Sequence, residues 1–150
     1  MTLTTTTHLN FRGQARAALT FYQTVFGGDL SIASYADFGM PTDVPGADNV
    51  VFGQVAGDNG FRVMAYDVPG EGGTAPAGET TRANGVTMTT EKFFVSIQGE
   101  TVDEVRGFWD KLVVDAIVIE SFGPAQWSPA FGMLTDRYGI TWILDVAAAH

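Results

Sequence analysis

The chain has 150 residues, no cysteine and a formal net charge of −9, with only eight basic residues. This composition excludes disulfides and thiolate metal sites, and it argues against a nucleic-acid partner, because phosphate binding requires clustered lysine and arginine. The sequence shows neither a basic region followed by an apolar run near its start nor about 18 consecutive apolar residues. We therefore expect a soluble cytoplasmic protein without a membrane partner.

The first half of the chain predicts a strand, a helix and three further strands. Residues 7–11 alternate between polar and apolar side chains, as in a half-buried strand. Residues 14–26 change to helical spacing, and Gly27 follows as a typical terminator. The apolar stripe of this helix consists of Ala15, Ala18, Leu19, Tyr22 and Phe26. The three later strands are predicted at residues 30–36, 50–55 and 61–68, the last two joined by a glycine-rich turn at 57–60.

The second half predicts the same order of elements. A strand at residues 92–97 is followed by a capping box, in which Thr101 and Glu104 satisfy free N–H groups at the start of a helix. The apolar face of this helix consists of Val102, Val105, Phe108, Trp109, Leu112 and Val113. Three strands are then predicted at residues 116–120, 131–135 and 140–146, with a turn at 136–139.

The segment between the halves, residues 69–90, is rich in Gly, Thr, Ala and Pro and has no periodicity. We interpret it as a linker, with a lid as the alternative, and Asn84-Gly85 as a local turn. Residues 70–75 fit the dinucleotide pattern G-x-G-x-x-A, but Pro76 and Gly78 prevent the helix that this motif requires. We therefore predict no nucleotide site here.

The two halves are copies of one unit. Gly13 corresponds to Gly99 at a spacing of 86 residues, and the same spacing brings Leu19 onto Val105. The repeat predicts an α+β domain with module one at 5–68, the linker at 69–90 and module two at 91–148. Clefts between paired units commonly bind ligands.

His8 and Trp127 each have a functional and a structural interpretation. His8 is either a metal ligand, an acid or base, or a histidine hydrogen-bonded within its sheet. The polar strand residues that would complete a metal site show no recognisable ligand spacing: Gln54, Asp67, Glu120 and Asp145. Trp127 lies in a predicted loop at 123–130, where it is either an anchor or a pocket wall. No serine nucleophile motif is present.

The stretches at residues 18–28 (ALTFYQTVFGG) and 131–142 (FGMLTDRYGITW), together with the repeat, resemble the vicinal oxygen chelate superfamily. This group holds glyoxalases, bleomycin resistance proteins and extradiol dioxygenases. The resemblance is stronger to its PhnB-like subgroup, which is often labelled 3-demethylubiquinone methyltransferase-like. It implies two βαβββ modules that form a U-shaped, eight-stranded mixed sheet with helices on the outer face, and it implies a homodimer.

The resemblance also implies where metal-dependent members hold their ion: on the first and last strands of each module. These positions are His8 and Phe94 on the first strands, and Leu144 with either Tyr66 or Ala65 on the last strands. Only His8 is a suitable donor, whereas a catalytic site needs three or four N and O ligands. We therefore expect no metal. No S-adenosylmethionine motif supports the methyltransferase label.

The leading hypothesis is a protein that binds a small organic ligand in the sheet hollow without a cofactor. The alternative is a lyase, transferase or dioxygenase that uses a divalent metal ion bound by His8. The net charge favours neutral or cationic ligands. The residues expected to line the hollow are His8, Asn10, Phe52, Gln54, Met64, Tyr66, Phe94 and Trp127.

Overall fold

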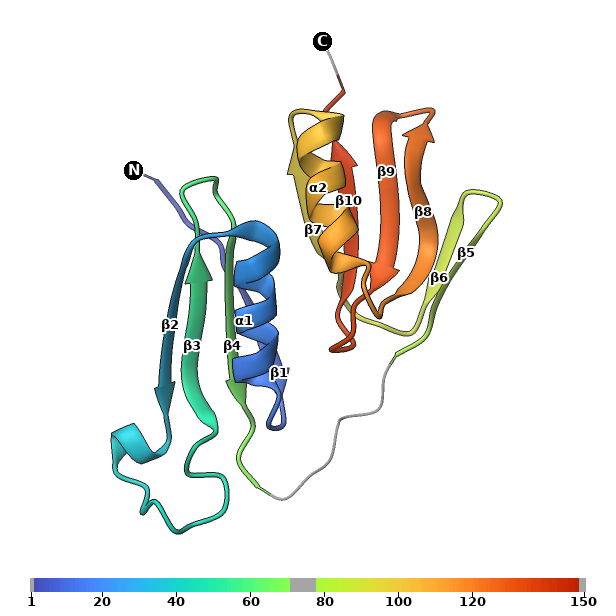
Figure 1. Ribbon diagram of the computed structural model, residues 1–150. Coiled ribbons are helices and arrows are strands. Elements are labelled where there is room, and N and C mark those ends of the chain that lie inside the picture. Colours follow the sequence, from blue (N-terminus) through green and yellow to red (C-terminus); the bar gives the residue numbers. More distant parts are fainter. Residues whose placement is uncertain (1, 71–77, 149–150) are drawn as a thin grey trace. The chain divides into compact units, whose positions relative to one another are not determined.

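The computed structural model describes residues 2–70 and 78–148. The chain divides into two compact units, Met1–Pro76 and Ala77–His150, called unit one and unit two below (Figure 1). No helix among the described residues is long and apolar enough to cross a membrane.

Unit one is a four-stranded sheet with one helix. Its elements are β1 (Thr7–Phe11), α1 (Ala15–Phe26), β2 (Asp29–Ser34), the 3-10 helix η1 (Ala36–Phe38), β3 (Val50–Ala56) and β4 (Arg62–Asp67). The strand order is β1-β4-β3-β2, with β1 parallel to β4 and the other neighbours antiparallel.

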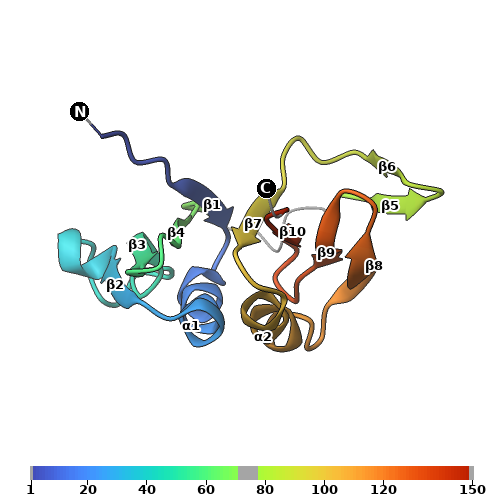
Figure 2. The ribbon, with the colours of Figure 1, turned by 90° about the horizontal axis from the view of Figure 1, so that it is seen from above.

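Unit two repeats this arrangement and adds a hairpin. Its elements are β5 (Thr80–Ala83), β6 (Val86–Thr89), β7 (Val95–Gly99), α2 (Val102–Leu112), β8 (Ile117–Ala125), β9 (Ser128–Thr135) and β10 (Thr141–Val146). The sheet order is β7-β10-β9-β8, with β7 parallel to β10. In Figure 2 the hairpin β5–β6 and α2 lie on opposite sides of this sheet.

The α+β class and the βαβββ order of each module are confirmed. All five residues of the predicted α1 stripe are buried, and α2 buries Val105, Trp109 and Leu112. The hydroxyl oxygen of Thr101 accepts a hydrogen bond from the Glu104 backbone N–H at 3.2 Å, so the cap at the start of α2 is present. Each helix therefore packs through the face that its sequence pattern indicates.

Several predicted boundaries differ from the structure, two of them by the most. Strand β7 begins at Val95 rather than at residue 92. The predicted loop at 123–130 is instead the end of a long hairpin, in which β8 and β9 are connected by Gln126 and Trp127. Pro124 lies in β8, an edge strand, where a missing N–H is tolerated.

The segment at 69–90 contains a hairpin that its composition did not predict. Strands β5 and β6 pair antiparallel. They are joined by Asn84 and Gly85, both with positive φ (53° and 75°), as in the tight turns that favour Asn-Gly. The local turn is thus confirmed, whereas the expected lack of regular structure is wrong for residues 80–89. Residues 71–75 of the rejected dinucleotide motif lie outside the described residues.

A glycine in the third strand of each module lets its helix approach the sheet closely. A Cβ on Gly53 would lie 2.3 Å from Leu19 Cδ1 of α1. A Cβ on Gly132 would lie 2.8 Å from Trp109 Cζ3 of α2. Real Cβ atoms do not approach other atoms so closely, so a larger residue at either position would force a neighbouring atom to shift. The two modules therefore share this packing device as well as their order of elements.

Candidate functional site

Each four-stranded sheet has one face under its helix and an opposite face, called the open face below. In β1 the buried residues Leu9 and Phe11 alternate with the exposed residues His8 and Asn10. Because neighbouring side chains in a strand point to opposite faces, His8 and Asn10 lie on the open face of unit one.

Strand register brings polar and apolar residues together on this face. His8 pairs with Met64, and Met64 pairs with Gln54, so the three form a row across β1, β4 and β3. Asn10 pairs with Tyr66 in the adjacent row. His8 Nδ1 lies 3.2 Å from Asn10 Oδ1, and the His8 and Tyr66 rings meet edge-on with centroids 5.3 Å apart.

Six of the eight residues expected to bind a ligand lie on this one face. Phe52 belongs to it because its neighbour Gly53 faces α1, and its side chain is 41% exposed. The six residues are His8, Asn10, Phe52, Gln54, Met64 and Tyr66. The other two belong to unit two: Phe94 precedes β7, and Trp127 lies at the β8–β9 turn.

The donor set around His8 within unit one does not fit a divalent metal. Its neighbours on the open face are an amide, a thioether and a phenol. The nearby carboxylate of Asp67 is buried beneath the sheet, where it accepts hydrogen bonds from the backbone N–H groups of Gly13 (2.7 Å), Ala15 (3.0 Å) and Val50 (2.8 Å). Across residues 2–70 and 78–148, no three His, Cys, Asp or Glu side chains come together in a metal-binding arrangement.

The last strand of module two presents different residues from those expected. Leu144 is fully buried together with Trp142 and Val146 on the α2 side, so its expected place on the ligand-facing side is wrong. Alternation puts Ile143 and Asp145 on the open face. In β4, alternation likewise favours Tyr66 over the fully buried Ala65. The error arose because the resemblance gave a position along β10 and did not establish which face of the sheet its side chain occupies.

Asp145 pairs in register with Gln98 of β7. Burial raises the pKa of the Asp145 carboxyl, and a hydrogen bond with Gln98 partly opposes this change. The open face of unit two therefore carries a carboxyl group that binds its proton more tightly than usual.

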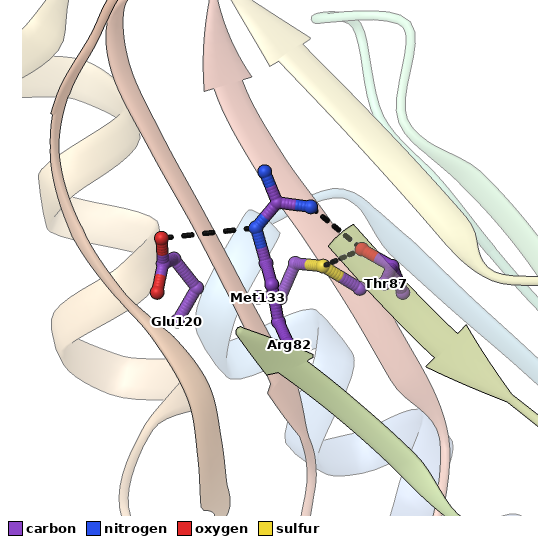
Figure 3. A network of polar contacts seen from close by, with 4 residues as sticks. All are labelled: Arg82, Thr87, Glu120 and Met133. Atoms are coloured by element: carbon purple, nitrogen blue, oxygen red, sulfur yellow. Dashed lines mark hydrogen bonds and ion pairs between the residues drawn. The ribbon is translucent and has the colours of Figure 1, made fainter. Parts of the chain in front are cut away.

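The hairpin β5–β6 covers another part of this face. Phe131 and Met133 of β9 are buried although they lie on the open face. Arg82 of β5 donates a hydrogen bond from Nη1 to the Thr87 hydroxyl at 2.6 Å, and its Nε lies 3.7 Å from a carboxylate oxygen of Glu120 (Figure 3). The Thr87 hydroxyl lies 3.9 Å from Met133 Sδ.

The guanidinium of Arg82 also lies against two aromatic rings. Its central carbon is 5.0 Å from the centroid of Phe131 and 5.6 Å from that of Trp127. The two rings meet edge-on at 5.2 Å, and Trp127 is 54% exposed. Trp127 thus contacts a covered part of the sheet and presents about half of its surface to solvent.

Glu91 attaches the base of the hairpin to the sheet. Its carboxylate accepts hydrogen bonds from the Thr80 hydroxyl of β5 and from the Thr141 hydroxyl of β10 (2.8 Å to the nearer oxygen). Sequence reasoning missed this contact and the environment of Arg82. The Asn84-Gly85 pair flanked by β-branched residues was the available signal for a hairpin, but no sequence signal indicated its partner strands.

A comparison with family models identifies the chain's relatives. The model described as "Glyoxalase/Bleomycin resistance protein/Dioxygenase superfamily" matches residues 7–144. The chain belongs to this superfamily. The resemblance indicated by residues 18–28 and 131–142 is therefore confirmed.

Individual proteins are similar over nearly the whole chain. Protein YjdN of Escherichia coli (strain K12) is 22% identical over 145 residues, which cover 93% of this chain and 92% of that protein. Protein PA1353 from Pseudomonas aeruginosa has a similar structure, with a TM-score of 0.74, 24% identity and coverage of 97% and 98%. A structure described as a putative 3-demethylubiquinone-9 3-methyltransferase, PhnB protein, from Bacillus cereus has a TM-score of 0.69, 25% identity and coverage of 97% and 100%.

Proposed function

We propose that this member of the glyoxalase superfamily binds a small organic ligand against the open faces of its sheets, without a metal ion. The observation that carries the proposal is the set of six side chains on the open face of unit one. It combines apolar groups with a few hydrogen-bonding groups, which is the usual composition of a small-molecule site.

The members of this set have distinct roles in the proposal. Phe52, Met64 and Tyr66 offer apolar and aromatic surface to the body of a ligand. The contacts with Asn10 and Tyr66 orient the His8 ring. Its Nε2 can then donate a hydrogen bond to the ligand or accept one from it. Binding by such a surface needs no reacting group, so sequestration of a compound is sufficient as a function.

The test is a thermal-shift screen of neutral, cationic and anionic organic compounds, with and without divalent metal ions. A compound that binds the native state raises the melting temperature by mass action. We expect a hit to lose at least about tenfold in affinity in Tyr66→Ala, because its aromatic surface is removed. The matched control is Thr20→Ala on the exposed side of α1, which should bind as the wild type does.

Three outcomes would contradict the proposal. One is the absence of any shift in the whole screen, and another is equal binding by Tyr66→Ala and the wild type. The third is stoichiometric metal in protein purified without chelators that is lost in His8→Ala, which would favour the metal-dependent enzyme.

Sedimentation of the purified protein tests the homodimer that we also propose from the superfamily resemblance.

A further inference from the structure

Arg82 is a buried cation whose hydrogen bonds are incomplete. Its side chain is only 9% exposed, and Nε is buried without a hydrogen-bond partner. Nη1 bonds to the Thr87 hydroxyl. A buried charged donor without an acceptor is costly, so an oxygen placed at Nε would improve this environment.

Glu120 balances the charge of Arg82 but does not form a hydrogen bond with its Nε. The 3.7 Å between Nε and the carboxylate oxygen is longer than a hydrogen bond. The Glu120 side chain is 48% exposed, so its carboxylate is already partly hydrated. The pair therefore combines a cation fixed in the protein with an anion that can move into water at small cost.

An aromatic surface adjoins this cation. The guanidinium lies over the rings of Trp127 and Phe131, and about half of Trp127 remains exposed. A flat organic group can pack on the exposed part of Trp127 while its charged end reaches the arginine. Charge and apolar surface are thus adjacent at one place in unit two.

We propose that Arg82 anchors the oxyanion of a small organic acid, which replaces Glu120 at Nε while its apolar body packs on Trp127. A guanidinium offers two parallel N–H groups to a carboxylate or phosphonate, an arrangement that one long contact to Glu120 does not use. The inference rests on the proposed small-molecule function and assigns a ligand class to one part of it, the place at Arg82 and Trp127 in unit two. It differs from the expectation of neutral or cationic ligands, which considered only the net charge, because a nearby cation acts on a bound anion more strongly than distant charges do.

The experiment titrates the protein with benzoate, phenylphosphonate and neutral benzamide, using the indole N–H resonances of its three tryptophans as the NMR readout. Benzoate and benzamide have nearly the same shape, so they differ mainly in charge. We expect both anions to shift the Trp127 signal and to bind at least about tenfold more tightly than benzamide. If only one anion shifts the signal, the oxyanion class narrows to carboxylate or phosphonate.

Variants separate ligand binding from a structural role of the ion pair. Glu120→Gln removes the competing anion and should tighten benzoate binding about threefold or more. The matched control Glu100→Gln removes one charge at another exposed position and should leave the affinity unchanged. Arg82→Lys keeps the cation but loses the paired donors, so it should weaken benzoate binding at least about tenfold. A purely structural pair would show no gain in Glu120→Gln.

The outcomes distinguish this inference from the proposed function. If screened compounds bind to the open face of unit one but benzoate binds no better than benzamide, the inference is overturned and the proposed function stands. Equal benzoate affinity in Glu120→Gln, Glu100→Gln and the wild type also overturns it. Rapid amide exchange in β5 and β6 would show that Arg82→Lys disrupts the hairpin. In that case the inference is judged only by the benzoate affinities of Glu120→Gln, Glu100→Gln and the wild type.

Discussion

The aspartate carboxyl groups of this molecule have different roles because their environments differ. Asp136 resembles Asp67 in that its buried carboxylate is surrounded by donors: the backbone N–H groups of Tyr138 and Ile140 and the indole N–H of Trp142. Such groups hold turns and strand ends in place. Asp145 instead lies partly buried on an open face, where it forms a hydrogen bond with Gln98.

The raised pKa of Asp145 predicts a pH-dependent cost to stability. The folded state binds this proton more tightly than the unfolded state, in which the carboxyl has its ordinary pKa of about 3.8. The free energy of unfolding therefore falls as pH rises from that value through the raised folded-state pKa, and stays lower above it. We expect Asp145→Asn to melt at a higher temperature than the wild type at pH 7, with the difference vanishing near pH 3.

Calorimetry from pH 3 to pH 7 measures this effect, with Asp110→Asn on the exposed side of α2 as the control. The control removes the same charge from a position in water. A constant difference between Asp145→Asn and the wild type across this range would show that the carboxyl of Asp145 is not the cause.

At the scale of elements, close contact between helix and sheet depends on one glycine in each module. Gly53 lies beneath Leu19, and Gly132 lies beneath Trp109. The indole of Trp109 also stacks on Phe122 with centroids 5.7 Å apart. The space at Gly132 is therefore filled by a large, well-packed ring that has little freedom to move.

Gly132→Ala should destabilise unit two by about 1–3 kcal/mol, because the added methyl overpacks this contact. The new Cβ would lie 2.8 Å from Trp109 Cζ3 and 2.9 Å from Phe122 Cα. The matched control is Gly123→Ala in the neighbouring strand, where nothing lies within 4 Å of the added atom. Urea denaturation measures both, and equal losses would contradict the packing explanation.

At the scale of the whole molecule, acidic residues outnumber basic ones by 17 to 8. Ion pairs among the described residues include Arg82–Glu120 and Arg137–Asp115, the latter at 4.0 Å with an exposed carboxylate. A net charge of −9 produces a repulsion within the chain that opposes the compact state.

Added salt should consequently stabilise the protein. We expect the melting temperature at pH 7 to rise by a few degrees between about 0.01 M and 0.15 M KCl, as the screening length falls from roughly 30 Å to 8 Å. Replacing exposed Glu100 and Asp110 with lysine should reduce this rise, since the net charge becomes smaller. A fall in melting temperature with salt would mean that attractive pairs dominate.

Much of the fold was predictable because its signals are local. The stripe from Ala15 to Phe26, the cap at Thr101 and the alternation in β1 each depend on residues within one element. The candidate residues on unit one followed from the same alternation. The β5–β6 hairpin was missed because its short strands are rich in threonine and lack an apolar period, although its Asn84-Gly85 turn was recognised.

The sequence by itself determined the repeated strand–helix–three-strand order, the buried helix faces and the superfamily, because periodicity, capping and turn residues act over a few positions. Only the tertiary structure decided that Leu144 faces α2 while Asp145 faces the open side, since a shift of one residue reverses the face of a strand. It alone brought Arg82 to Glu120 and Trp127. These residues belong to different hairpins, and their contact depends on how β5 and β6 pack on the sheet.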